Sequence, residues 1–397
     1  MARLVLRPGD QEGVTELMTA VAECKIRTTE RLLLSGADLQ ARDKNGRNVI
    51  YHAFSTSEMT EEVLEVFELL GKQGVDFNSS LDTDGCSALI TAITLDWPII
   101  VQLLITLGAD IHDEGMPKFG ASVSTDLALA GGYVEQGDNQ HRDHDRFVFS
   151  KGCGQHVSPL LCATMLRRDA IIDILLSAGA DCQQTSLCSF WKSSNVGACS
   201  VCDVRISPVH IAAYHGDVEL LQRLLEVCRE HCLQGNSDTS RPLVGSALPE
   251  EDITPLWLAL LRGETGAVKT LLAYDYPKAP PCHFGSGLHV SLEEDHYDNA
   301  RLLLCSGYDL WEDLEWIESE LYPTTNKDII EFIGDFVTQP PSLVVCSRNA
   351  LRQHMGPRLP AYLSTLHMPQ KVANVILLKD VLSSDNSASA DDVLLTV

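Results

Sequence analysis

A short pattern recurs along this chain of 397 residues and constrains its fold more than any other feature. The pattern begins with a small polar residue, has an apolar residue at its third position and ends on a small residue. Repetition of this kind is typical of solenoids, in which each unit buries its apolar face only against its neighbours. The pattern is found at residues 15–20, 48–53, 87–92, 158–163, 207–212, 254–259 and 286–291.

A second landmark closes the unit. Gly36, Gly108, Gly179 and Gly307 each lie 21 residues after the Thr or Ser that opens the pattern, and each follows a leucine-rich segment. A glycine just beyond an apolar periodic segment is typical of a helix C-terminus. The constant distance therefore predicts one supersecondary unit made of two helices.

The openings at Ser87 and Ser158 are 71 residues apart, about twice the period, and this gap predicts a further, degenerate repeat. Thr125–Ala130 supplies its first helix, and Phe147–Gly152 is interpreted as the remnant of its second helix. The prediction is about eight repeats, of which the fourth is degenerate.

Insertions account for the irregular spacings. Because solenoid insertions map to loops on one face, often the binding face, their positions bear on function. Their polarity predicts that much of each is mobile. They are expected near residues 135–145, 183–205 and 230–252.

The recurring segments resemble the first helix of the ankyrin repeat, whose pattern is T-P-L-H-x-A. Ser207–Ala212 and Thr254–Ala259 carry the pattern most clearly. The resemblance implies an all-α solenoid of helix-turn-helix repeats with short hairpin loops, over residues 12–310 and after an N-terminal segment at 1–11.

The repeat pattern stops after Leu310. Trp311–Leu321 and Asn326–Val337 are predicted to be helices that cap the open end of the stack, within a capping and linker segment at 311–340. Pro340-Pro341 then punctuates the chain.

Residues 341–382 resemble a SOCS box, a small three-helix module. Leu343, Ser347 and Leu351 fall on the key positions of its elongin C-binding box, with Ser347 where the family more often has cysteine. Arg352 matches the arginine that follows. The resemblance implies that these four residues bind elongin C.

The segment that begins at Leu366 resembles the cullin-5 box of the same module. His367 replaces its first proline and Val375 its tyrosine, so cullin contact is the weaker of the two inferences. The residues that the resemblance assigns to cullin binding are Leu366, Met368, Pro369, Val372 and Val375.

Repeats first and this box last is the order of the ankyrin repeat and SOCS box family, which the chain resembles over residues 12–382. The resemblance implies a non-catalytic subunit of an elongin B/C–cullin-5 RING ubiquitin ligase, joined by a RING-box protein. The repeats would bind a target protein, leading to its ubiquitination and proteasomal degradation. The alternative is an ankyrin scaffold without ligase assembly, whose last helices only cap the array.

The net charge of the chain limits the classes of partner that it can bind. The chain has 55 acidic against 30 basic residues, a net charge of −25, which repels nucleic acid and anionic membranes and suits a basic epitope on the substrate. No segment reaches the ~18 to 20 apolar residues of a membrane span, and the N-terminus does not resemble a signal peptide. We expect a cytoplasmic protein, with the nucleus also open, and thiols rather than disulfides among its 13 cysteines.

Few residues suggest chemistry. Cys182, Cys188, Cys199 and Cys202 include one Cys-x-x-Cys pair suited to zinc, with His210 nearby, against the alternative of a loop with unbound thiols. No phosphate-binding glycine loop or catalytic motif is found, so we expect no cofactor and no enzyme activity.

Trp97 and Trp257 could be substrate anchors on the repeats or could pack between repeats. The polar tail at residues 383–397 is predicted to be disordered.

Overall fold

The computed structural model describes residues 13–56, 59–115, 146–148, 156–192, 200–234, 253–274, 285–310, 313–319, 322–338, 342–355, 359–366 and 368–382. The chain forms two compact units, Met1–Pro208 and Val209–Val397.

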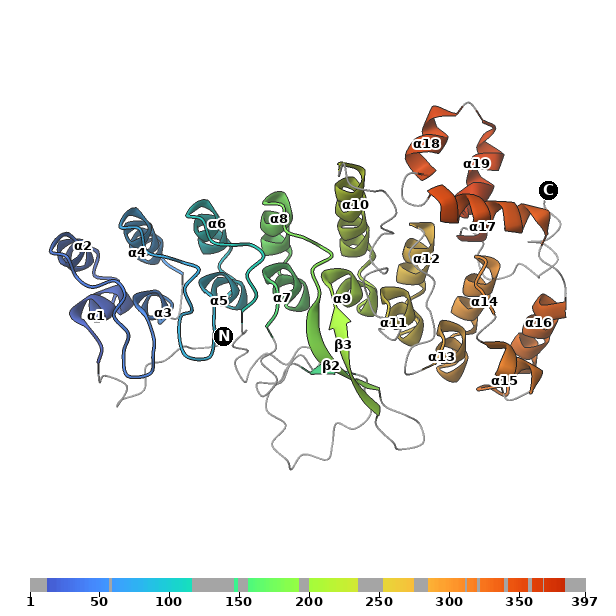
Figure 1. The fold of residues 1–397 in the computed structure, drawn as a ribbon, viewed down its shortest axis with the longest axis horizontal. Coiled ribbons are helices and arrows are strands. Elements are labelled where there is room, and N and C mark those ends of the chain that lie inside the picture. Colours follow the sequence, from blue (N-terminus) through green and yellow to red (C-terminus); the bar gives the residue numbers. More distant parts are fainter. Residues whose placement is uncertain are drawn as a thin grey trace. The chain divides into compact units, whose positions relative to one another are not determined.

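The first unit consists of helix pairs (Figure 1). The shorter first helices pack beside one another, α1 on α3 and α5 on α7, and the second helices form their own row, in which α2, α4, α6 and α8 pack in sequence. The bounds are α1 (Glu16–Ala22), α2 (Ile26–Leu34), α3 (Val49–Ala53), α4 (Glu61–Lys72), α5 (Ala88–Thr94), α6 (Pro98–Thr106), α7 (Pro159–Met165) and α8 (Asp169–Ser177).

The second unit continues the same architecture and ends in six further helices. Its paired helices are α9 (Pro208–Tyr214) with α10 (Val218–Gln234), α11 (Pro255–Leu261) with α12 (Thr265–Ala273), and α13 (Gly287–Glu293) with α14 (Tyr297–Cys305). The others are α15 (Leu314–Glu318), α16 (Lys327–Thr338), α17 (Leu343–Met355), α18 (Leu359–Thr365), α19 (Gln370–Ile376) and α20 (Lys379–Leu382).

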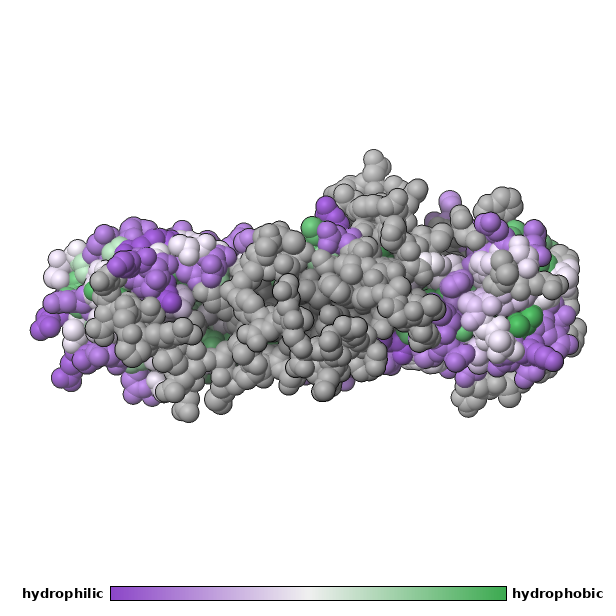
Figure 2. Space-filling model, turned by 90° about the horizontal axis from the view of Figure 1, so that it is seen from below, coloured by the Kyte–Doolittle hydropathy of each residue, from purple (hydrophilic) through white to green (hydrophobic). Residues whose placement is uncertain are grey.

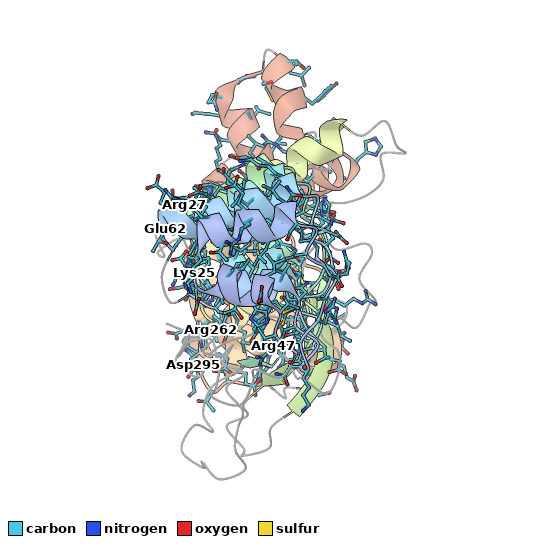
Figure 3. All side chains as sticks on the ribbon, turned by 90° about the vertical axis from the view of Figure 1, so that its left-hand side faces the viewer. Lys25, Arg27, Arg47, Glu62, Arg262 and Asp295 are labelled. Atoms are coloured by element: carbon cyan, nitrogen blue, oxygen red, sulfur yellow. The ribbon has the colours of Figure 1, made fainter. Side chains whose placement is uncertain are left out.

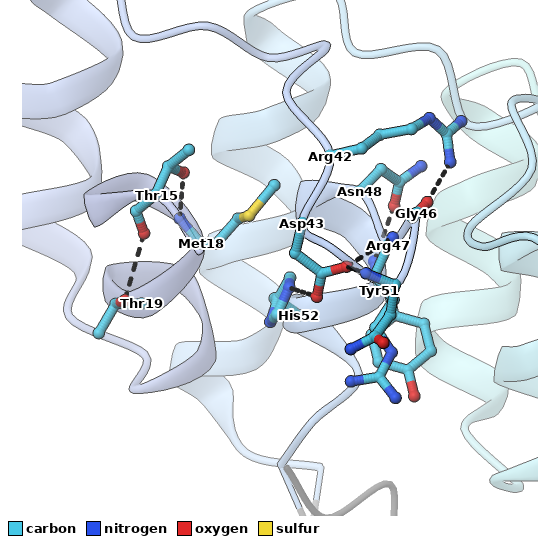
Figure 4. Close-up of polar contacts among 11 residues, drawn as sticks. Thr15, Met18, Thr19, Arg42, Asp43, Gly46, Arg47, Asn48, Tyr51 and His52 are labelled. Carbon is cyan, nitrogen blue, oxygen red and sulfur yellow. Dashed lines mark hydrogen bonds and ion pairs between the residues drawn. The ribbon is translucent and has the colours of Figure 1, made fainter. Parts of the chain in front are cut away.

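The polar residue that opens each repeat caps the first helix. Its side-chain oxygen accepts a hydrogen bond from the backbone N–H three residues later, which satisfies a donor that the helix leaves unpaired. Figure 4 shows this contact from Met18 to Thr15 and from Tyr51 to Asn48. The same cap is made by Ser87, Ser158, Thr254 and Ser286, so the predicted helix starts are confirmed at these positions.

The turn between the paired helices uses one conformation in the six pairs for which the structure describes it. The residue nine positions after the cap has a positive φ, which lets the chain reverse into the second helix. Glycine occupies this position in two repeats, Gly216 and Gly263, whereas Cys24, Asp96, Arg167 and Asp295 adopt it with φ of 53 to 60°.

Two insertions form a sheet, which corrects the all-α prediction. The strands β1 (Arg146–Val148), β2 (Ser186–Lys192) and β3 (Ser200–Ile206) lie in the order β1-β2-β3, and both pairings are antiparallel. Phe147 pairs with Phe190, and Cys188 with Val204. The 183–205 insertion is therefore an ordered hairpin over its described part, and Phe147 lies in a strand rather than in a helix remnant.

The described part of the stack has no place for the fourth, degenerate repeat. Helix α5 packs directly on α7 and α6 on α8, so no helix pair fits between them. The backbones of Gly115 and Val157 exchange two hydrogen bonds, of 3.1 and 3.0 Å, which brings the ends of the intervening segment together. Thr125–Ala130 and residues 135–145 themselves lie outside the described residues, and the described helix pairs number seven.

The third insertion begins as a helix. Helix α10 continues to Gln234, beyond the expected start at residue 230, and residues 235–252 lie outside the described part of the chain. Helices α15 and α16 confirm that both predicted capping segments are helical. The N-terminal residues 1–11 and the tail 383–397 also lie outside the described residues.

The C-terminal helices fold onto the last repeats. Helix α17 packs on α19, and α20 packs on both α12 and α14. Residues 341–382 therefore belong to the same compact unit as the repeats that precede them, and not to a separate domain.

Polar residues dominate the described part of one face of the molecule. Seen from below in Figure 2, the described residues are mostly hydrophilic, with a few apolar spots. Among the described residues no single helix is long and apolar enough to span a membrane; α16 and α17 meet that test only jointly and are bent by 87° at their break.

Candidate functional site

The two tryptophans proposed as substrate anchors are core residues. Trp97 is 6% exposed and stacks on Phe54 with ring centroids 5.7 Å apart. Trp257 is completely buried, and its Nε1–H donates to the carbonyl of Gly285 at 3.1 Å. Neither side chain can meet a partner, so packing between repeats is the correct interpretation for both.

His210 is likewise structural. It is completely buried on α9, and its Nε2 lies 3.0 Å from the carbonyl of Ile253, so this nitrogen must donate. Burial lowers the pKa of His210 to about 4, which keeps the imidazole neutral near pH 7. The residue is therefore a buried, hydrogen-bonded part of the repeat and not a base at the surface.

The cysteine-rich insertion does not form a zinc site in the described residues. Cys182 is disulfide-bonded, as is Cys228, so Cys182 has no thiolate to offer a metal and the expectation of thiols is wrong for these two. Cys188 is buried in β2, Cys202 belongs to β3, and Cys199 lies outside the described residues. No group of His, Cys, Asp or Glu that could hold a metal is found in the described part of the chain.

A buried contact between a histidine and a carboxylate lies in the described part of the first unit. His52 Nε2 and Asp43 Oδ2 are 3.3 Å apart, and both side chains are completely buried (Figure 4). The other carboxylate oxygen of Asp43 accepts from the backbone N–H groups of Asn45 and Arg47, which ties the hairpin to α3. Burial lowers the pKa of His52, with Asp43 opposing this effect. The pair is part of the repeat scaffold.

Three arginines on the repeats, Arg47, Arg262 and Arg301, are held against aromatic rings. The guanidinium of Arg47 lies 4.8 Å from the centre of the Tyr51 ring, and that of Arg262 lies 5.1 Å from the Tyr214 ring. Arg47 and Arg262 are labelled in Figure 3. These contacts restrict the three side chains, so they offer less freedom than ordinary surface arginines.

Helix α17 has an unusual distribution of side chains. Leu343 is 81% exposed, and Ser347, four residues later, is also exposed. Leu351 is half-buried, so the three residues assigned to elongin C binding follow one stripe that turns gradually away from solvent. This stripe carries the apolar surface of the helix outward.

Arg352 lies on the opposite side and corrects one prediction. It is only 4% exposed, and its guanidinium donates to the carbonyl of Leu272 at 2.6 Å and to that of Ile376 at 3.3 Å. Because both contacts are inside the unit, Arg352 anchors α17 and is not available to a partner. Sequence reasoning missed Arg348, which has the same role: it is 4% exposed and donates to the carbonyl of Cys305 at 2.9 Å.

The residues assigned to cullin binding lie along α19 and in the turn that precedes it. Leu366 and Val372 are 40% and 47% exposed, and Pro369 is the exposed N-cap residue of α19. Met368 and Val375 are half-buried. His367 lies outside the described residues.

Exposed large apolar side chains are concentrated in this C-terminal segment. We call five of them the exposed apolar set, because they account for most such residues in the described part of the chain; the rest are scattered over α2, α6, β2 and α16. Clusters of this kind mark protein interaction sites more often than single exposed residues do. The set comprises Leu343, Val344, Tyr362, Leu366 and Val372.

Comparison with known proteins identifies the repeats. The sequence matches the family described as ankyrin repeats (3 copies) at residues 17–114 and 209–313, just over half of the chain. No curated protein matches significantly. Among solved structures, the crystal structure of the human ASB11 ankyrin repeat domain is similar, with 14% identity, 75% of this chain and 99% of that chain covered, and a TM-score of 0.40. Because the match to the ankyrin-repeat family covers just over half of the chain, the chain belongs to the ankyrin-repeat family.

Proposed function

We propose that this protein is the substrate-recognition subunit of an elongin B/C–cullin-5 RING ubiquitin ligase. Its ankyrin repeats would bind a target protein, and the stripe of Leu343, Ser347 and Leu351 would bind elongin C. The chain would be non-catalytic and would act in the cytoplasm or nucleus. Its contribution to the rate would be the effective concentration of the target lysine near a ubiquitin-loaded enzyme.

The observation that supports this proposal most is the exposure of side chains on α17, which is the reverse of the usual one. Leucine is normally buried and arginine normally exposed, yet Leu343 is 81% exposed while Arg348 and Arg352 are 4% exposed. The arginines of this helix make contacts inside the unit, whereas its first leucine is exposed to solvent. This arrangement supports the proposal that a partner protein covers Leu343. Burying one leucine side chain in such a partner contributes roughly 1.5 to 3 kcal/mol.

The cullin part of the proposal rests on a second exposed patch. Leu366, Pro369 and Val372 are exposed close together in sequence, at the turn that leads into α19. Cullin-5, together with a RING-box protein, would contact these residues beside the elongin site. The substrate would be a protein with a basic epitope, because the chain carries a net charge of −25.

Co-purification from cells that express elongins B and C tests the elongin contact. Leu343→Ala should weaken elongin capture by about thirtyfold, which corresponds to ~2 kcal/mol. Leu34→Ala is the matched control, since Leu34 on α2 is 76% exposed but lies outside the C-terminal segment. Both variants should keep the melting temperature of the wild type, because neither side chain is packed.

The alternative function is an ankyrin scaffold without ligase assembly. It predicts that a folded wild-type protein captures no elongin, and that Leu343→Ala and Leu34→Ala behave alike. Addition of cullin-5 to a recovered elongin complex then tests the second patch. Val372→Asp should reduce cullin capture and leave elongin capture unchanged.

A further inference from the structure

The buried arginines of α17 meet two different repeats at equivalent places. Arg348 donates to the carbonyl of Cys305, the last residue of α14. Arg352 donates to the carbonyl of Leu272, the last residue but one of α12. One helix thus contacts the C-terminal ends of two successive second helices.

The chemistry of these contacts is that of a helix cap. The last carbonyls of an α-helix have no partner within the helix and carry the negative end of its dipole. A guanidinium satisfies such a carbonyl and complements its partial charge, with the strength of a charge-assisted hydrogen bond. Arginine presents several donors in a fixed fork, and Arg352 uses two of its nitrogens, one toward α12 and one toward Ile376 at the end of α19.

A close contact of backbone and side chain lies between the two arginines. Gly307 follows α14 with φ of +90°, and a Cβ placed on it would fall 1.9 Å from Nδ2 of Asn349. The φ favours glycine at this position, and a Cβ there would displace the side-chain amide of Asn349 from its place against the repeat.

The equivalent glycines elsewhere have no such neighbour. Gly36, Gly108 and Gly179 have φ of +84 to +92° and occupy the same position in their repeats, but a Cβ on any of them would meet nothing within 4 Å. The crowding is specific to the place where α17 lies. The last repeat is thus shaped to receive this helix.

We propose that Arg348 and Arg352 are positioning residues that fix the exposed stripe of α17 in one orientation relative to the last repeats, by capping α14 and α12 across the close contact of Gly307 with Asn349. The consequence for ubiquitin transfer rests on the proposed function, whereas the docking itself does not. Because the two arginines contact two different repeats, they fix the direction of the α17 axis relative to those repeats. A single contact would leave the helix free to pivot. A partner bound at Leu343 would then be held at a set angle to a target bound on the repeats of this unit.

Hydrogen exchange on the full chain, measured by mass spectrometry without any partner, tests the docking. Gly307→Ala should speed exchange of the peptides that cover α17 at least tenfold. Gly179→Ala has the same backbone strain without the collision, and should leave α17 unchanged. Gly307→Ala/Asn349→Ala removes the colliding amide and should restore most of the protection.

If α17 exchanged in the Gly307→Ala variant at the same rate as in the wild type, the proposal would be overturned. Peptides from α11 and α13 report whether the unit as a whole has opened. If they also exchange faster, the milder variant Arg352→Lys decides, because one ammonium cannot reproduce the fork to both α12 and α19. That variant should speed exchange in α17 and α19 alone, and unchanged rates there would contradict the assigned role.

A second readout separates positioning from folding. If elongins bind, the Gly307→Ala and Arg352→Lys proteins should retain elongin affinity within about threefold, since Leu343 and Ser347 are untouched, while ubiquitination of a bound target falls at least fivefold. Unchanged ubiquitination would refute the positioning role. If no elongin binds the wild type, the proposed function fails, and the exchange experiment still tests the docking.

Discussion

His210 and Trp257 occupy the same position in their repeats, and each donates a ring N–H to the backbone carbonyl just before the next repeat begins. The acceptors are Ile253 and Gly285, at 3.0 and 3.1 Å. An indole replaces an imidazole here because both rings offer an N–H at their edge. Tryptophan in place of histidine adds apolar volume to the core and keeps the hydrogen bond that links one repeat to the next.

Trp257→Ala should therefore cost stability rather than binding. The variant loses a completely buried side chain and leaves the Gly285 carbonyl without this donor, for which we expect a loss of about 3 to 5 kcal/mol in the free energy of unfolding. Urea unfolding followed by circular dichroism measures it. A loss below about 1 kcal/mol, together with weaker partner binding, would restore the anchor interpretation.

His210 should make stability depend on pH. Its pKa falls from the usual 6.5 to about 4 because the folded protein buries it in neutral form. The unfolded chain therefore binds the extra proton first, and this stability is fully present above pH 6.5 and is lost as the pH falls from 6.5 toward 4. The shift corresponds to ~3 kcal/mol.

Comparison with His210→Gln isolates this effect, because glutamine can donate to Ile253 but does not titrate. Urea unfolding at pH 7 and pH 4.5 should show a larger loss for the wild type than for the variant. Since His52 is present in both proteins, its titration cancels in the comparison. Parallel losses would mean that His210 is already charged in the folded state.

The segment between Gly115 and Val157 should be removable. These two residues form a pair with both hydrogen bonds, the geometry that precedes a two-residue hairpin turn. Replacing residues 116–156 by Asn-Gly removes β1 and its pairing with β2 but leaves the contacts of α5 with α7. The stack of α5 on α7 should persist, because a shorter loop costs less closure entropy. Calorimetry should show a melting temperature within a few degrees of the wild type, whereas collapse of the first unit would indicate that a repeat had been deleted.

Asp313 should be a critical acceptor in the second unit. The carboxylate is completely buried, and one oxygen accepts from the hydroxyl of Ser286 and from Nε1 of Trp316 at 2.9 Å. Asp313→Ala leaves these buried donors without their acceptor, for which we expect a loss of ~2 to 4 kcal/mol. Asp335→Ala, at an exposed position of α16, is the control, and chemical denaturation of both variants gives the comparison.

Local rules predicted the repeats well. The residues that open each repeat were identified because helix capping is decided within four residues, and Thr15, Ser87, Ser158 and Thr254 make the caps that their identities suggest. The glycine at the end of the second helix follows equally local chemistry. The capping residue and the glycine can therefore both be recognised from the local sequence, without knowledge of distant contacts.

The features that the sequence did not reveal depend on distant contacts. The sheet pairs residues 146–148 with 189–191, across a whole repeat. Strands of three and seven residues are too short for their periodicity to predict such a distant pairing. Arg352 was assigned to elongin C because it matches the arginine that follows the elongin C-binding box, and only the carbonyls of Leu272 and Ile376 explain its burial. The spacing of two arginines four residues apart was the available signal.

The insertion sheet changes how the first unit can come apart. A solenoid can lose its repeats one at a time, since each contacts only its neighbours. Here β1 precedes α7 and α8 in the chain, β2 and β3 follow them, and the three strands are hydrogen-bonded together. The repeat of α7 and α8 therefore lies within a loop of chain whose ends are joined by the pairing of β1 with β2. A pulling force applied along the chain must shear this pairing before the repeat can unfold.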